Sequence, residues 1–525
     1  MNAWAPRAAS AALAFLLLAA PAADAGAKVF RWSSVADHSS ADPHGQNQIV
    51  NNAINGQVYE PLVKRGKKLE VTPGLAESWS QVSPTVWRFN LRKGVKWHDG
   101  SAFTADDVVF SIKRAQGDTS TFRVFARAVG EPRRIDDFTV EFTTPMPNPV
   151  MLETLALVQT MSKSWCEKHN VQRAQDFAKK EETYASRNAM GTGPYTLVSR
   201  EPDVKSRFKR NPNWWGKFEG NVDEIEYTTV KSDATRMSAL AAGDLDLVLD
   251  PPLQDIERLA RDPRIRIYRE PENLVFFLGM DQSRDELLYS DLKGRNPFKD
   301  RRVRLALYQA IDTDAINRVV MRGLAVPAAL ILPNPEAAGV PAELNKRFAY
   351  DVAAAKRLLA EAGYPNGFST VIDCQNVRES VCTAIAGMLA RIGVNVRVNS
   401  LQNARYFAKG QARDTSFFLL GWGGPNTDAI FTLQPLLHGR NEKGDGDYNW
   451  GDYRDAKMDA LIDQAKVEMD GAKRQALIDE ALKMVRDNVY LIPIHRRMAP
   501  WASRANVQVV VRPDSWVEAS WVTIR

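Results

Sequence analysis

Hydrophobic and polar positions follow two periods along this chain, which predicts a mixed α/β fold. Residues 87–91 alternate with the two-residue period of a strand. Residues 104–107 form a capping-box pattern in front of a run with helical spacing. Asp300 and Asp351 precede two further runs of this kind, and the second run ends at Gly363.

A longer segment predicts a β-α-β-α-β unit. Its expected elements are strand 370–373, helix 379–391, strand 395–399, helix 404–412 and strand 416–420. Such a unit implies a mostly parallel sheet with helices packed over it.

Two loops at the ends of predicted strands are candidate ligand loops. Residues 250–254 follow a strand at 245–249, and residues 421–428 follow the strand at 416–420. In open α/β sheets, ligands bind beyond the carboxyl ends of the strands. If the two loops belong to separate lobes, a cleft between the lobes would bring them face to face.

The N-terminus predicts export. Arg7 precedes an apolar run over residues 8–20, and residues 23–25 (Ala-Asp-Ala) fit a cleavage site. We therefore predict a signal peptide over residues 1–25, cleaved near Ala25, and a periplasmic protein. The alternative is an uncleaved anchor, although the apolar run is short for a membrane span.

Composition narrows the class of protein. The 525 residues are 44% hydrophobic and carry 69 Lys+Arg against 63 Asp+Glu, a net charge of +6. This composition excludes disorder, and the length of the chain predicts two to four folded units. The small positive charge indicates a solvated surface, and we expect no nucleic-acid partner.

Motifs for catalysis, cofactors and metals are missing from the sequence. It has no G-x-S-x-G elbow, H-E-x-x-H helix or Walker A loop. A calcium-loop pattern beginning at Asp445 fails at Trp450 and Ala456. We therefore predict no cofactor and no metal, while a carboxylate pair of an exported hydrolase stays an open alternative.

The three cysteines suggest one disulfide. Cys374 ends a predicted strand, and Cys382 lies in the first turn of the next helix. In an oxidising compartment the two are expected to form a bridge, the alternative being two separately buried thiols. Cys166 is expected to be a buried free thiol.

Several motifs together resemble one protein family. Residues 87–110 (WRFNLRKGVKWHDGSAFTADDVVF) are the most specific match, and shorter matches follow in the same order as in the family. These shorter matches lie at residues 59–62, 75–79, 191–195, 211–215, 242–246, 301–306, 358–364 and 493–495. The chain thus resembles the extracytoplasmic solute-binding proteins, family 5, of ATP-driven importers, which include dipeptide-, oligopeptide- and nickel-binding proteins.

This resemblance implies a two-lobe periplasmic binding fold of type II, with an extra inserted domain and a cleft between the lobes. The implied division is lobe one at 26–58, 189–273 and 496–525, the inserted domain at 59–188, and lobe two at 274–495. The mechanism would be solute capture by lobe closure, followed by delivery to an inner-membrane permease. The protein would act as a monomer and would not be an enzyme.

The resemblance also suggests ligand-binding residues. Trp422 matches a tryptophan of the family's ligand loop and would form an aromatic wall. Familiar peptide binders have an Asp three residues later that pairs with the peptide ammonium, but here that position is Pro425. Asp428 could serve instead from a shifted loop, or it could cap the helix that follows.

Further candidates follow from their positions in the two loops and at the lobe boundary. They are Gly424, Asn426, Asn273, Asp250 and Pro251. His438 lies near the place where some nickel-type members carry a histidine, and its alternative is an ordinary surface histidine.

The predicted function is therefore capture of a small solute, with a peptide favoured. An opine, an oligosaccharide or a nickel chelate remain alternatives within the same class. An exported hydrolase is the alternative from a different class.

Overall fold

The structure, a computed structural model, describes residues 26–442 and 444–525. The predicted signal peptide at residues 1–25 lies outside the described residues. Among the helices of the described part, none combines the length and hydrophobicity needed to cross a membrane.

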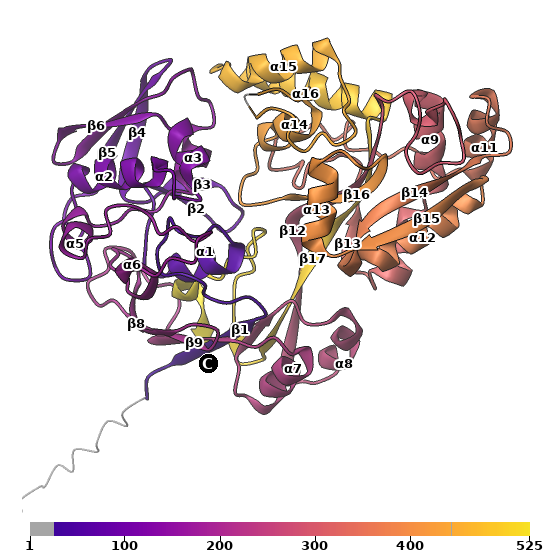
Figure 1. The fold of residues 1–525 in the computed structure, drawn as a ribbon. Coiled ribbons are helices and arrows are strands. Elements are labelled where there is room, and N and C mark those ends of the chain that lie inside the picture. Colours follow the sequence, from indigo (N-terminus) through magenta and orange to yellow (C-terminus); the bar gives the residue numbers. More distant parts are fainter. Residues whose placement is uncertain (1–25, 443) are drawn as a thin grey trace, which may run out of the picture.

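One long mixed sheet runs through the molecule (Figure 1). In spatial order its strands are β15 (Val394–Leu401), β14 (Phe368–Gln375), β16 (Phe417–Gly423), β12 (Ile265–Met280), β17 (Leu491–Arg504), β11 (Leu247–Leu249), β1 (Val29–Ser34), β10 (Glu224–Thr229), β9 (Lys205–Arg210) and β8 (Tyr195–Glu201), with β13 (Ala325–Pro327) paired to β17.

Two strands of this sheet, β12 and β17, join two bodies that Figure 1 shows on either side of them. β12 pairs with β16 on one side, and β17 pairs with β11 on the other. Their mutual register shifts between Pro271 and Val275. We call the body around β1 and β8–β10 the first lobe and the body around β14–β16 the second lobe. The predicted crossing points, 273/274 and 495/496, lie within these two strands.

The predicted β-α-β-α-β unit is present in the second lobe. β14 runs parallel to both β15 and β16, with α12 (Glu379–Ala390) and α13 (Asn403–Gln411) between the strands. The sheet as a whole is mixed, because β12 and β17 pair antiparallel with their neighbours. The expectation of a mostly parallel sheet therefore holds for this unit and for β1 with its neighbours β10 and β11, but not for the whole sheet.

A separate four-stranded sheet forms its own core beside the first lobe. Its strands are β4 (Ala76–Ser83), β5 (Val86–Leu91), β7 (Thr139–Thr143) and β6 (Glu131–Asp136). Helix α2 (Ala105–Gln116) covers it and begins with the predicted capping box at Thr104. Several residues that the predicted division places in the inserted domain pack in the core that contains β1 and β10, among them Met161, Trp165, Cys166, Val171 and Ala185.

The remaining elements surround these sheets. The short strands are β2 (Val63–Arg65), β3 (Val71–Pro73), β18 (Val507–Gln508) and β19 (Thr523–Ile524). The other helices are α1 (Ile49–Asn55), α3 (Arg123–Ala128), α4 (Met151–Leu155), α5 (Lys163–Lys168), α6 (Tyr184–Arg187), α7 (Asp233–Ala242), α8 (Ile256–Ala260), α9 (Arg301–Ala310), α10 (Thr313–Ala315), α11 (Val352–Glu361), α14 (Ile430–Leu437), α15 (Ala456–Val467) and α16 (Gly471–Asn488).

The cysteine predictions are confirmed. Cys374 and Cys382 form a disulfide between the end of β14 and the first turn of α12. A loop this short contributes about 2–3 kcal/mol in the chain-entropy account. Cys166 is a buried free thiol, and its burial raises its pKa to about 12.

Candidate functional site

A cavity of about 750 Å³ lies between the lobes. It is lined from one side by α1, α3 and the loops around them, and from the other mainly by the end of β16 and by residues that follow it. Asp514 and Trp516, near the C-terminus, also line it. This volume is typical of a small-molecule site.

The side contributed by residues before 160 is mostly hydrophobic, and we call it the apolar wall. It consists of Ile49, Phe122, Val124, Phe125, Met146 and Leu157. Three of these side chains are unusually exposed for their type: Val124 is 70% exposed, Met146 53% and Ile49 50%. Exposed apolar side chains grouped around a cavity indicate a surface that a ligand covers.

The opposite side is held by hydrogen bonds, and we call it the anchored wall. It consists of Trp422, Gly424, Asn426, Phe431, Tyr448 and Arg474. Asn273, which is 3% exposed, donates from its side-chain amide to the carbonyls of Gly424 (2.5 Å) and Asn426 (2.8 Å). The Gly424 amide donates back to the Asn273 carbonyl (3.1 Å). These contacts fix the loop after β16 against β12.

Glycines make this close approach feasible. A Cβ on Gly423 would lie 2.0 Å from the Asn273 carbonyl oxygen, and Gly424 has a φ of +149°. A side chain at position 423 would push the loop away from β12, and the positive φ at position 424 favours glycine.

Trp422 is also fixed within this wall. Its indole N–H donates to the Phe431 carbonyl (3.0 Å), and its ring packs edge-on against Tyr448 with centroids 5.0 Å apart. Trp422 lines the cavity, so the structure places it where an aromatic wall was predicted.

Asp428 does not line the cavity. Its carboxylate accepts two hydrogen bonds from Arg474, at 2.6 and 2.8 Å, and one from the Ile430 amide at 2.9 Å. The last contact matches the capping alternative. Arg474 does line the cavity, so Asp428 is linked to the cavity only indirectly, by holding the Arg474 side chain.

Asn426 connects the two sides of the cleft. Its side-chain oxygen accepts a hydrogen bond from Arg65 of β2 (2.9 Å), and Arg65 also pairs with Glu153 of α4. The cleft is therefore bridged at this point by a polar contact between residues far apart in the sequence.

The loop at 250–254 is not among the residues that line the cavity. Asp250 lies 3.4 Å from Arg497 of β17, which also pairs with Glu272 of β12. Pro251 is buried. The structure thus brings Asn273, Gly424, Asn426 and Trp422 together and leaves Asp250 and Pro251 at the connecting strands.

His438 also lies outside the cavity lining. His438 is only 6% exposed, so the alternative of an ordinary surface histidine is wrong. The reason is that the chain turns inward after α14 and places the ring against α15.

A buried neutral histidine supports the apolar wall. His44 accepts from Arg114 (3.0 Å) and contacts the Gln159 carbonyl (2.9 Å), and its ring lies 6.4 Å from that of Phe122. Burial, together with the positive charge of Arg114, lowers the pKa of His44 to about 4. His38, in the same segment, has its pKa lowered to about 3 by burial and by Arg200.

Sequence reasoning missed the whole apolar wall, together with Arg65, Tyr448 and Arg474. Residues 145–149 (Pro-Met-Pro-Asn-Pro) do carry one signal, since an apolar residue between prolines cannot join a helix or a central strand. The other contacts depend on which distant segments meet.

Comparison with known proteins places this geometry in a family. A sequence profile of the bacterial extracellular solute-binding proteins, family 5 (middle region), matches residues 70–444. The chain is 29% identical to heme-binding protein A of Haemophilus influenzae, over 84% of this chain and 82% of that protein. It is 26% identical to the dipeptide-binding protein of Escherichia coli, over 86% of each.

A comparison with solved structures agrees with this family assignment. HbpA2 from Haemophilus parasuis superposes with a TM-score of 0.79 at 25% identity, covering 95% of this chain and all of that one. Because the family profile spans more than half of the sequence, this chain belongs to the bacterial extracellular solute-binding proteins of family 5.

Proposed function

We propose that this protein captures a peptide with apolar side chains in the cavity between its lobes. As the binding component of an ATP-driven importer, it then delivers the peptide to a membrane permease. The observation that carries the proposal is the pairing of an anchored wall with an apolar wall across one cavity. A fixed polar loop suits a peptide backbone, and the apolar wall suits its side chains.

The charged groups of the cavity limit which peptides fit. Among the described residues that line it, the charged side chains are Lys466, Arg474 and Asp514. Each is already paired: Lys466 with Asp445, Arg474 with Asp428 and Asp514 with Arg512. A peptide ammonium therefore meets no unpaired carboxylate here. We expect backbone and side-chain contacts, rather than terminal charges, to supply the affinity.

Heme is a second candidate solute. The apolar wall would suit the face of a porphyrin, and one relative is a heme-binding protein. An opine, an oligosaccharide or a nickel chelate would each need more free polar groups than this wall offers. The hydrolase alternative needs a pair of carboxylates at the substrate, whereas Asp514 is held by Arg512.

A thermal-unfolding screen tests the proposal. The solutes are free and N-acetylated peptides rich in Leu or Phe, heme, an opine, an oligosaccharide and a nickel chelate. A solute at a hundred times its Kd adds about 2.7 kcal/mol to the unfolding free energy. Stabilisation by both forms of apolar peptide is the expected result. If only another class of solute stabilises the protein, that class and not a peptide is its solute.

Trp422 gives a sharper test once a solute is found. Trp422→Ala is expected to weaken binding by about 1–3 kcal/mol, because an aromatic contact is lost. Trp422→Phe keeps the ring and loses the indole N–H, so its affinity should lie between those of the wild type and the Ala variant. Unchanged affinity of the Ala variant would remove Trp422 from the site.

A further inference from the structure

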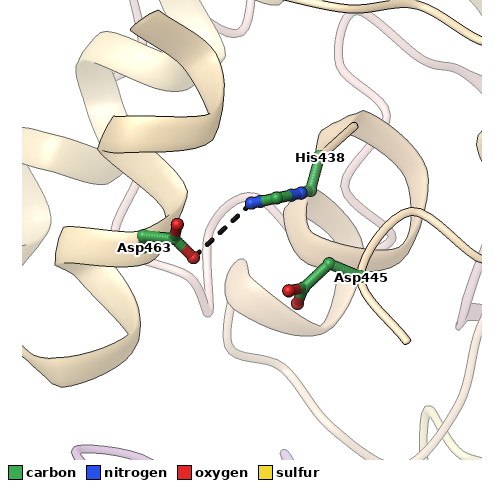
Figure 2. A group of neighbouring side chains, drawn as sticks. All are labelled: His438, Asp445 and Asp463. Atoms are coloured by element: carbon green, nitrogen blue, oxygen red, sulfur yellow. Dashed lines mark ion pairs between the residues drawn. The ribbon is translucent and has the colours of Figure 1, made fainter. Parts of the chain in front are cut away.

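Outside the solute cavity, three side chains converge from one helix and the loop before it. His438 directly follows α14, Asp445 lies in the next loop, and Asp463 lies on α15 (Figure 2). One ligand atom of each residue lies within 4.8 Å of those of the other two. The ring of His438 points toward Asp463, and the carboxylate of Asp445 lies beside both.

The hydrogen bond of His438 orients one ring nitrogen into this cluster. Nδ1 lies 2.6 Å from the Gly439 carbonyl oxygen, which can only accept, so Nδ1 carries the hydrogen. Nε2 is fully buried, makes no hydrogen bond within the described structure, and lies 3.5 Å from a carboxylate oxygen of Asp463. In the neutral ring, Nε2 presents a lone pair toward a carboxylate. A cation between the two would turn this repulsion into attraction.

This is the arrangement of a metal-binding histidine, in which one nitrogen donates to a carbonyl and the other faces the metal. Asp445 is supported in the same way. It is 3% exposed and accepts hydrogen bonds from Gln434 (2.6 Å) and Asn441 (2.8 Å). These contacts hold its carboxylate in place beside the ring.

The cluster carries more negative than positive charge. Lys466 lies 2.9 Å from Asp445 and 3.4 Å from Asp463, so its ammonium bridges the two carboxylates. Asp459 adds a third carboxylate 3.8 Å from His438 Nδ1. The cluster therefore holds three carboxylates and one ammonium, and a dication would balance this charge better.

We propose that His438 Nε2 and the carboxylates of Asp445 and Asp463 bind one divalent transition-metal ion of the zinc or nickel class. One imidazole nitrogen with two carboxylate oxygens suits these ions, and water would complete the coordination. The site is separate from the solute, because none of the three side chains lines the cavity. This proposal departs from the sequence prediction of no metal. For Asp445 that prediction considered only the loop pattern beginning at this residue, whereas Asp463 lies on α15.

The test is a calorimetric titration of the untagged, chelator-treated protein with Zn²⁺, Ni²⁺ or Co²⁺, each added as the free ion without a solute. The absorption spectrum is recorded for Co²⁺. The expected result is one ion per chain, with Co²⁺ absorption bands that indicate a nitrogen ligand. No binding of any of the three ions by the wild-type protein would overturn the proposal.

Variants distinguish this site from adventitious binding. Asp463 is exposed, so Asp463→Asn should fold normally and bind the metal at least tenfold more weakly. Glu480→Gln, which removes an exposed carboxylate on the neighbouring α16, should change nothing. Equal affinity of Asp463→Asn and the wild type would place the ion elsewhere and overturn the proposal.

Lys466→Met supplies an opposite test. It removes the ammonium that competes for Asp445, so metal affinity should rise several-fold. Unchanged or weaker affinity would show that the ion does not bind at Asp445, and the proposal would fail.

Discussion

The two walls of the cavity are built in opposite ways. The loop of the anchored wall is tied to β12 by Asn273, and Arg474 is tied to Asp428. In the apolar wall, Val124 and Met146 are exposed, and a bound solute would bury their apolar surfaces. One wall is pre-organised for polar contacts, whereas the other offers an adaptable apolar surface.

This difference suggests a division of labour. Contacts with a pre-organised wall cost little ordering entropy, so they supply affinity for a feature that all solutes share. An apolar wall with a flexible methionine can pack against different side chains. We therefore expect the anchored wall to set affinity and the apolar wall to set a broad preference among solutes. The predictions below test this division.

The largest expected effect is the response to acid. His38 and His44 are neutral in the folded protein, with pKa values lowered to about 3 and 4. In the unfolded chain they protonate below about pH 6.5. The unfolded state then binds more protons, so stability falls as the pH drops below 6.5. At about pH 5 each histidine should have cost about 2 kcal/mol of unfolding free energy.

Denaturant unfolding at neutral pH and at about pH 5 measures this loss. His44→Gln should reduce the pH dependence, because it removes one of the two buried imidazoles whose pKa is lowered. Hydrogen exchange should then show α3 loosening before α14. Equal loosening of both helices would mean that acid does not distinguish the two walls.

The second prediction concerns the fixed loop. Asn273→Ala leaves the carbonyls of Gly424 and Asn426 without their donor, which should cost about 2 kcal/mol of unfolding free energy. Solute affinity should fall about tenfold, because the loop must be ordered on binding. Chemical denaturation and calorimetry measure the two effects.

Asn52 is the matched control for this variant. It lines the cavity from α1, and within the described part of the chain its side chain hydrogen-bonds only to the exposed Asn47. Asn52→Ala should cost less than about 0.5 kcal/mol of stability. If the two variants behave alike, the loop is not held by Asn273.

The sequence predicted those parts of the molecule that local signals determine. The capping box at Thr104, the helices that follow Asp300 and Asp351, and the helix beginning at Glu379 all appear in the structure. Each is set by residues within a few positions of one another. Trp422 and its loop could be placed because they end such an element.

The rest depends on contacts between distant residues. β12 and β17 were not predicted, because their pairing joins residues more than two hundred positions apart. The partner of Asp428 lies 46 positions later on α16, so the sequence did not show that its carboxylate is occupied. The exposure of Val124 and Met146 also has no periodic signal, since Val124 lies in the short helix α3 and Met146 in an irregular segment.

The third prediction tests whether Asp428 serves the anchored wall or the solute. Asp428→Asn weakens a partly buried, two-fold hydrogen-bonded pair with Arg474 and should cost about 1–2 kcal/mol of unfolding free energy. Affinity should change equally for free and N-acetylated peptides. A loss confined to peptides with a free ammonium would show that Asp428 pairs with the solute.

The smallest expected effect concerns the apolar wall. Val124→Ser should leave stability unchanged, because the side chain is 70% exposed. It should weaken peptides with Leu or Phe side chains by about 0.5–1 kcal/mol, and Ser-rich peptides less, because only apolar side chains bury this surface. Val319, which is 76% exposed and does not line the cavity, provides the control Val319→Ser. Equal losses for apolar and polar peptides would show that this wall does not read side chains, and the proposed division between the walls would then be wrong.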